Sequence, residues 1–127
     1  MTSSPRPPRR GRLSRSAEFE RAYRQGRSHG NRFLVLYAFP RGDEEPARLG
    51  LSVSRKVGGA VDRNRVKRLV RESFQSHVSD LRAGYDFVVV ARPDARELAE
   101  RSGLAGIGEA LGELLARASA REEEHAA

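Results

Sequence analysis

The sequence predicts a single domain of mixed α and β structure with a short tail at each end. Its 127 residues fit one domain on the usual scale of roughly 100–200 residues per domain. Segments with helical spacing of apolar residues alternate with segments rich in β-branched and aromatic residues. The hydrophobic fraction of 38% is enough for one modest core, and no apolar run approaches the ~18–20 residues of a membrane-spanning helix. We therefore expect a soluble protein that does not enter a membrane.

Positive charge dominates the composition. Lys+Arg number 24 against 17 for Asp+Glu, which gives a net charge of +7 and favours polyanionic partners. Only Lys56 and Lys67 are lysines, an arginine bias that genome composition explains as well as phosphate binding does. The absence of cysteine excludes disulfides and thiolate chemistry and is compatible with a reducing cytoplasm. No apolar segment follows the basic N-terminus, so we expect a cytoplasmic protein rather than an exported one.

The N-terminal region divides into an arm and a helix. Residues 1–15 hold five arginines, three prolines and no acid, which predicts a disordered basic arm. The arm is either a solvated leader without a role or an electrostatic tether to nucleic acid. Ser16 can cap a helix over residues 16–25, in which Phe19 and Tyr23 share one face.

Two strands are predicted next. Residues 32–40 (RFLVLYAFP) are rich in β-branched and aromatic residues, and a short extended stretch over 27–30 can precede them. Residues 42–46 form a turn or loop, and residues 48–54 (RLGLSVS) alternate apolar and small residues with a period of two. We expect the strands over 32–40 and 48–54 to pair as an antiparallel hairpin.

A helix is the clearest element of the second half. It is predicted from Asp62, a candidate N-cap, to about residue 77, because the apolar side chains fall at helical spacing; these are Val66, Leu69, Val70, Phe74 and His77. Residues 86–91 (DFVVVA) are apolar at successive positions, so neither face of this strand is suited to contact with water. We therefore expect it to lie centrally in a sheet.

A last helix is predicted from about residue 104 to residue 120, with its start left open. Leu104, Ile107, Leu111 and Leu114 have the required spacing, although each glycine in this region costs a helix roughly 1 kcal/mol relative to alanine. Residues 94–127 carry eight acids and four arginines, so this part of the chain should not face RNA. The folded domain is expected to cover residues 16–120, with residues 121–127 as a disordered acidic tail.

The helix over residues 62–77 has a basic face opposite its apolar one. Residues 54–72 hold seven cations and two acids, and most of these cations have no acid at i+4. A solvated helix face usually mixes the signs of its charges, whereas a row of unpaired guanidinium groups suits phosphate oxygens. An ordinary soluble surface helix remains the alternative. The outward residues and those that flank them are Arg63, Asn64, Arg65, Lys67, Arg68 and Arg71.

The run over residues 51–74 (LSVSRKVGGAVDRNRVKRLVRESF) resembles the signature of the bacterial ribonuclease P protein component, with its Arg-Asn-Arg core at 63–65. The resemblance covers roughly residues 13–93 and includes Asn31-Arg32 and the strand over 85–92; the last helix agrees only in general character. It implies an α+β fold, a two-layer αβββαβα sandwich of the ribosomal protein S5 domain 2-like type. The same resemblance implies a left-handed βαβ crossover, although such crossovers are right-handed in about 98% of cases.

The resemblance also implies a division of labour within a ribonucleoprotein. The RNA subunit would be the catalyst, and this protein would hold precursor tRNA while the 5′ leader is removed by hydrolysis. The partners implied are ribonuclease P RNA and precursor tRNA, with Mg²⁺ bound mainly by RNA, no organic cofactor and no obligate protein partner. The residues agree with a non-catalytic protein, because Asp43, Glu44 and Glu45 share one turn without a second acidic cluster and because the histidines are scattered.

Two sets of site residues follow from the resemblance. The face that approaches the RNA subunit comprises Arg63, Asn64, Arg65, Lys67, Arg68 and Arg71. The cleft for the single-stranded leader comprises Phe19, Tyr23, Tyr37, Ser52, Ser54 and Lys56. Aromatic rings accept any base, at ~1–3 kcal/mol per stacked base. Phe19 and Tyr23 could instead be core residues, and Ser52 and Ser54 could merely face water.

Two functional alternatives accompany this interpretation. A ribosomal or other structural RNA-binding protein could use a similar basic surface and would stimulate no cleavage. A self-sufficient nuclease is disfavoured by the missing acidic site, so we expect the isolated protein to be inactive.

Overall fold

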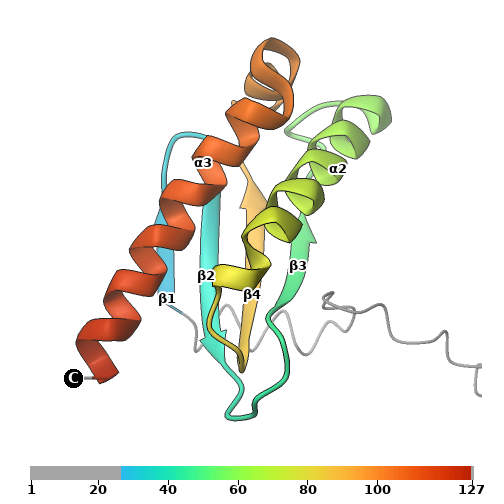
Figure 1. Cartoon of the computed structure of the whole chain (residues 1–127). Helices are drawn as coiled ribbons and strands as arrows, with labels where there is room; N and C mark the ends of the chain where they lie inside the picture. Colours follow the sequence, from blue (N-terminus) through green and yellow to red (C-terminus); the bar gives the residue numbers. More distant parts are fainter. Residues whose placement is uncertain (1–26, 127) are drawn as a thin grey trace, which may run out of the picture.

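The structure is a computed structural model and describes residues 27–126, in which two helices lie across one face of a four-stranded sheet (Figure 1). The arm predicted over residues 1–15 and the helix predicted over 16–25, with Phe19 and Tyr23, lie outside the described residues. The elements are β1 (Arg27–Gly30), β2 (Leu34–Pro40), β3 (Arg48–Ser52), α2 (Ala60–His77), a 3-10 turn (Val78–Asp80), β4 (Tyr85–Ala91) and α3 (Ala95–Ala126).

The strand order is β1-β2-β4-β3, so β4 lies centrally as predicted. β2 pairs antiparallel with both β1 and β4, whereas β3 runs parallel to β4. The predicted hairpin between the second and third strands is therefore wrong. The apolar strand β4 (YDFVVVA) is buried at five of its seven positions, and it separates β2 from β3 because a partner on each edge satisfies all its backbone groups.

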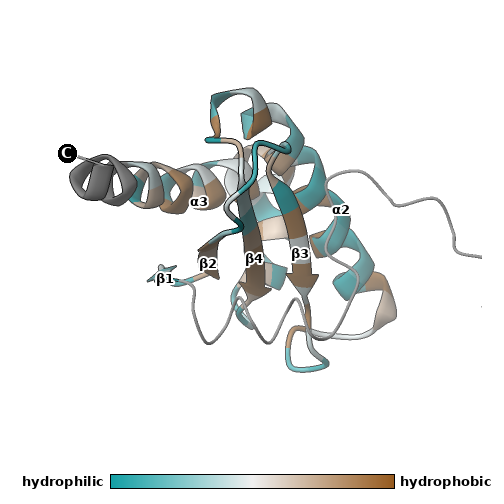
Figure 2. Ribbon diagram, turned by 90° about the horizontal axis from the view of Figure 1, so that it is seen from below, coloured by the Kyte–Doolittle hydropathy of each residue, from teal (hydrophilic) through white to brown (hydrophobic). Residues whose placement is uncertain are grey.

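The core fills the space between the sheet and the two helices. Alternate residues of β2 and β4, such as Leu36 and Val89, point to this side and are fully buried. They meet the apolar face of α2, where the rings of Phe74 and Phe87 lie 6.0 Å apart. Figure 2 shows that the strands are largely apolar, whereas the outer side of α2 is largely polar. Burying a side chain of this size stabilises the fold by ~1.5–3 kcal/mol, so the core fixes the orientation of α2.

Both long helices differ from their predicted starts. α2 begins at Ala60, its N-cap is Gly59 without a side-chain cap, and Asp62 lies within the first turn instead of capping it. α3 begins at Ala95, because Leu98 and other residues before the predicted start are buried against the core.

A break near the start of α3 explains why its first part was not predicted from the spacing of apolar residues. Gly103 has a φ of +52°, a left-handed conformation that favours glycine, and the helix changes direction there. The apolar pattern before the break is therefore out of phase with the pattern after it. The helix continues to Ala126, past the predicted domain boundary at 120.

A buried carboxylate joins the ends of three strands. Asp86 of β4 is 4% exposed and accepts hydrogen bonds from Arg41 Nη1 at 2.5 Å and Arg48 Nε at 2.8 Å. Arg41 also pairs with Asp43 in the β2–β3 loop at 2.9 Å, and this hydrogen bond is the main cause that lowers the pKa of Asp43. These contacts hold the loop onto the sheet at the end opposite to the start of α2.

Candidate nucleic-acid interface

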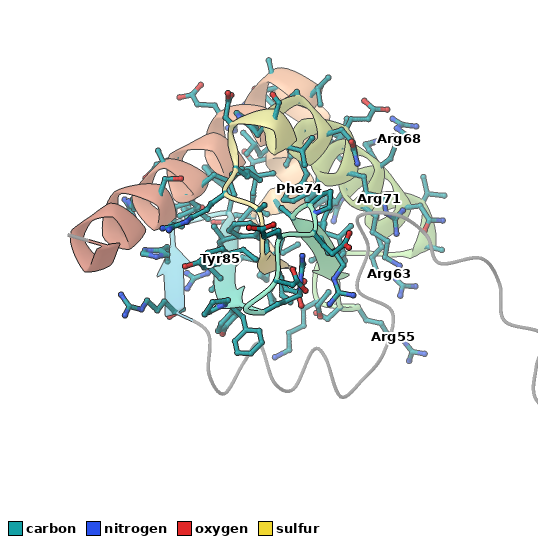
Figure 3. All side chains as sticks on the ribbon, turned by 60° about the horizontal axis from the view of Figure 1, so that its bottom comes forward. Arg55, Arg63, Arg68, Arg71, Phe74 and Tyr85 are labelled. Atoms are coloured by element: carbon teal, nitrogen blue, oxygen red, sulfur yellow. The ribbon has the colours of Figure 1, made fainter. Side chains whose placement is uncertain are left out.

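The predicted RNA-subunit residues all lie on the outer side of α2. The opposite side of the helix is buried against the sheet and α3, and this burial leaves the polar residues at the surface. Asn64 and Arg68 are exposed, and the other four are partly exposed. Figure 3 shows Arg63, Arg68 and Arg71 along this edge, with Arg55 in the loop before the helix. We call Arg63, Asn64, Arg65, Lys67, Arg68 and Arg71 the basic stripe.

Unpaired charge distinguishes Arg65, Lys67 and Arg68 of the basic stripe from the arginines of α3. Within residues 27–126, Arg65, Lys67 and Arg68 form no ion pair or side-chain hydrogen bond, and neither does Arg63. The Nε atom of Arg63 is buried and lacks an acceptor in the same part of the chain. A buried donor without a partner costs ~1–3 kcal/mol, so Arg63 has most to gain from an added acceptor.

The arginines Arg101 and Arg117 of α3, unlike Arg65 and Arg68 of the basic stripe, pair with glutamates. Arg101 pairs with Glu97 at 2.9 Å and Arg117 with Glu113 at 2.7 Å, each across one helical turn. In the β1–β2 turn, Arg32 pairs with Asp94 at 2.8 Å, and this hydrogen bond is the main cause that raises the pKa of Arg32. The described cations of α3 are therefore neutralised within the protein, whereas Arg65, Lys67 and Arg68 of the basic stripe are available to phosphate oxygens.

The loop between β3 and α2 carries two more exposed cations, Arg55 and Lys56. Val57, which is 2% exposed, anchors this loop in the core. Gly58 has a φ of +155°, and a Cβ added there would lie 2.7 Å from an oxygen of Asp62. Glycine is therefore required for the loop to pack closely on the first turn of α2, which keeps both cations beside the basic stripe.

The other face of the sheet, away from α2 and α3, holds the described part of the predicted leader cleft. Tyr37 lies opposite Val88, which lies opposite Gly50, so these three residues form one row across the face. In the next row Val90 lies opposite Ser52. We call this surface, which neither α2 nor α3 covers, the open face; its centre is closely packed, since Val88 is fully buried and Phe39 is 5% exposed. It carries an apolar group of Phe39 and Val88, with Tyr37 and Val90 packed against them.

The structure places the predicted leader residues in two groups. Tyr37 and Ser52 share the open face and are partly exposed. Ser54 and Lys56 lie beyond the end of β3, where Ser54 Oγ accepts a hydrogen bond from the Lys56 backbone N–H at 3.3 Å. This bond gives Ser54 a structural role in the turn.

One candidate residue of the open face, Arg92, was not predicted from the sequence. Arg92 follows β4 in the alternation that places Val88 and Val90 on this face, and its side chain is exposed. A Cβ added at Gly30 of β1 would lie 3.9 Å from Arg92 Nη2, so the guanidinium group lies at the β1 edge of the sheet. The alternation along β4 was the available signal for this residue.

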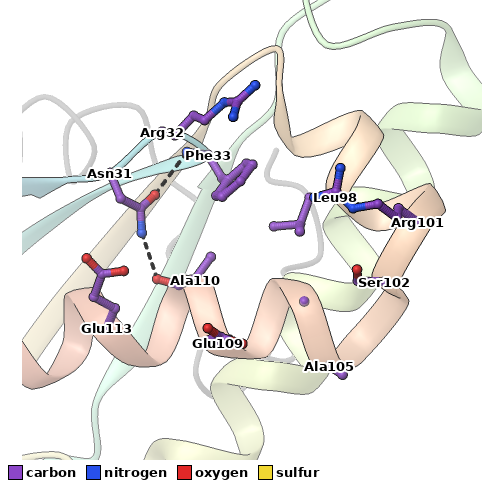
Figure 4. Close-up of a pocket in the computed structure, with 11 residues that line it drawn as sticks. Asn31, Arg32, Phe33, Leu98, Arg101, Ser102, Ala105, Glu109, Ala110 and Glu113 are labelled. Carbon is purple, nitrogen blue, oxygen red and sulfur yellow. Dashed lines mark hydrogen bonds between the residues drawn. The ribbon is translucent and has the colours of Figure 1, made fainter.

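A depression of about 610 Å³ lies between the β1–β2 turn and α3 (Figure 4). At its edge Asn31 donates a hydrogen bond to the Ala110 carbonyl at 3.0 Å and accepts one from the Leu34 N–H at 2.9 Å. Arg101 and Glu113 in its lining are both paired with neighbours on α3. The depression therefore lacks the unpaired positive charge of the basic stripe.

Among the residues that the structure describes, no three histidine or acidic side chains are grouped so that they could hold a metal ion. No described helix is long and apolar enough to cross a membrane.

Comparisons with known proteins agree with this geometry. A protein-family model described as Ribonuclease P matches residues 8–118. The ribonuclease P protein component of Shouchella clausii is 47% identical over 87 residues, which are 68% of this chain and 71% of that protein.

Two solved structures share the fold. The ribonuclease P protein of Thermotoga maritima has 35% identity and a TM-score of 0.76, covering 85% of this chain and 97% of its own. A mutant Staphylococcus aureus ribonuclease P protein, described as having defective mRNA degradation activity, has 37% identity and a TM-score of 0.77. The match covers 86% of this chain and 88% of that protein. This chain belongs to the bacterial ribonuclease P protein family and is thus the protein component of the ribonucleoprotein endonuclease that processes tRNA.

Proposed function

We propose that the basic stripe binds the RNA subunit of ribonuclease P and that the open face, with the loop before α2, binds the 5′ leader of precursor tRNA. The observation that carries the first part is the lack of carboxylate partners for Arg65, Lys67 and Arg68 within the described residues. Guanidinium groups bind phosphate oxygens through two parallel hydrogen bonds, so such a row suits a folded RNA backbone.

The open face suits a leader of variable sequence. Tyr37 offers a ring to any base, and Lys56 and Arg92 lie at one end of the face, where they can contact the backbone phosphates. Phe19 and Tyr23 remain part of this proposal from the resemblance. Readout of this kind gives weak sequence preference.

The proposed contribution to cleavage is positioning, with the catalytic centre on the RNA subunit. Holding the leader beside that subunit makes substrate alignment partly intramolecular. We assign Mg²⁺ mainly to RNA phosphates, because the acids of the β2–β3 loop do not fit a metal site: Asp43 there is engaged by Arg41 at 2.9 Å. The positive surface would lower repulsion between the two RNAs and thereby favour bound Mg²⁺.

Two further parts of the proposal concern topology and location. The left-handed sense of the β3–α2–β4 crossover is supported by Figure 1, where both strands point upward, α2 lies in front and β4 lies to the left of β3. A cytoplasmic location accords with the absence of cysteine from the sequence.

The proposed function is tested by cleavage of precursor tRNA by ribonuclease P RNA at low Mg²⁺, with and without the protein. We expect the protein to restore cleavage that the RNA alone performs poorly, and the isolated protein to cleave nothing. Binding to the RNA without stimulation at any Mg²⁺ concentration would favour a structural RNA-binding protein instead. An mRNA substrate in the protein-only reaction tests the activity named for the Staphylococcus aureus relative.

The leader site has its own test in the change Tyr37→Ala. Loss of one stacked base costs ~1–3 kcal/mol, so we expect the holoenzyme to bind a long-leader precursor tRNA about 5- to 150-fold more weakly. Affinity for the RNA subunit and for a substrate with a one-nucleotide leader should not change. The control Tyr37→Phe keeps the ring and should bind normally; equal losses for both leader lengths would place Tyr37 outside the leader site.

A further inference from the structure

One carboxylate lies inside the basic surface. Asp62 is the only acid between Pro46 and Arg71, and it directly precedes Arg63 of the basic stripe. Its side chain is 25% exposed and packs against Gly58 of the loop that carries Lys56. A negative charge at this point repels the phosphates of an RNA backbone.

A residue of α3 faces this carboxylate. Figure 1 places the first turns of α2 and α3 at the same end of the sheet, and Arg96 Nε lies 3.5 Å from Asp62 Oδ2. The same nitrogen lies 3.4 Å from Glu100 of its own helix. Arg96 is the one cation on the described part of α3 that reaches an acid of α2.

We propose that Arg96 is a positioning residue of the RNA-binding surface: it holds and neutralises the Asp62 carboxylate, so that the basic stripe meets RNA without a repelling negative charge beside it. This inference rests on the proposed function of the basic stripe. Arg96 acts through Asp62 and needs no phosphate contact of its own. α3, whose other described arginines pair with acids of the same helix, thereby contributes to RNA binding indirectly.

Single and double variants separate this role from its alternatives, with affinity for ribonuclease P RNA as the readout. Arg96→Ala leaves the carboxylate uncompensated and should weaken binding about three- to tenfold. Asp62→Asn removes that charge and should strengthen binding about two- to fivefold. The double variant should bind within about twofold of Asp62→Asn, because Arg96 has nothing left to neutralise.

The decisive result is that the two single variants change the affinity for ribonuclease P RNA in opposite directions. Both variants break the same ion pair, so a merely structural role predicts that both weaken binding and lower the melting temperature together. A direct phosphate contact predicts that Arg96→Ala costs the same with and without Asp62. Either result would overturn the proposal. Arg96→Lys keeps the charge and should restore binding.

Matched controls come from the neighbouring ion pair of α3. Arg101→Ala and Glu97→Gln change the net charge in the same ways, but their pair, at 2.9 Å, lies within α3. We expect less than a twofold effect from either, and larger effects would mean that net charge alone sets affinity. A wild-type protein that fails to bind ribonuclease P RNA would contradict the proposed function itself, whereas normal wild-type binding with equal-sign variants contradicts only the role of Arg96.

Discussion

Replacing Arg65 and Arg68 together with alanine is expected to weaken binding of ribonuclease P RNA by about 100-fold or more. Hydrogen bonds to charged groups contribute ~1.5–3 kcal/mol each, and each 1.4 kcal/mol is about tenfold in affinity. Both side chains lack a carboxylate partner among the described residues, so neither loss is offset by freeing an acid. The dependence of affinity on salt concentration should become shallower by about two units, one per lost phosphate contact. Affinity measured across a salt series checks both expectations.

The matched control is the double change Arg101→Ala and Arg117→Ala. It removes the same charge from α3, where both arginines are already paired with glutamates. We expect this control to bind nearly as tightly as the wild type, with an almost unchanged salt dependence. Equal losses in the two double variants would show that total charge, and not the basic stripe, determines binding.

Replacing Asp86 with alanine is expected to lower the free energy of unfolding by about 3 kcal/mol or more. The change removes the buried carboxylate that joins Arg41 and Arg48, whose side chains are 9% and 34% exposed, and leaves Arg41 with the more exposed Asp43. Removing one partner of a largely buried ion pair is among the most costly changes to a fold. Urea unfolding followed by circular dichroism measures the loss.

Asp43 provides the comparison for Asp86. Its carboxylate also pairs with Arg41, but its side chain is 46% exposed and water can replace it. Asp43→Ala should therefore destabilise the protein far less than Asp86→Ala. Similar losses from the two variants would mean that burial of Asp86 adds nothing to the strength of the network.

The elements that local sequence patterns determine were predictable. The apolar spacing of Val66, Val70 and Phe74 predicted α2 with an N-cap three residues from the observed one, and the unbroken apolar run of β4 indicated its central place. The pairing of β3 was not predictable from its neighbours in sequence, because a parallel partner comes only after a helix. The first part of α3 was not predicted, because the left-handed φ of Gly103 breaks the helix and shifts the spacing of its apolar residues.

The basic stripe was readable for the same reason as α2, since a single helix fixes which side chains share a face. The open face was harder to predict from the sequence, because its rows combine residues of separate strands whose order depends on the crossover. Tyr37 and Ser52 were named from the resemblance, and Arg92 was missed. The contact between Arg96 and Asp62 depends on the packing of α3 against α2, which no local pattern records.

The central claim is that this protein holds the leader of precursor tRNA for cleavage by an RNA catalyst. The most direct measurement compares kcat/KM of the reconstituted holoenzyme at low Mg²⁺ for precursor tRNAs with long and with one-nucleotide leaders, relative to the RNA alone. We predict that the protein stimulates cleavage of the long-leader substrate more strongly, by a margin that Tyr37→Ala removes. Stimulation of the same size for both leader lengths would contradict the claim.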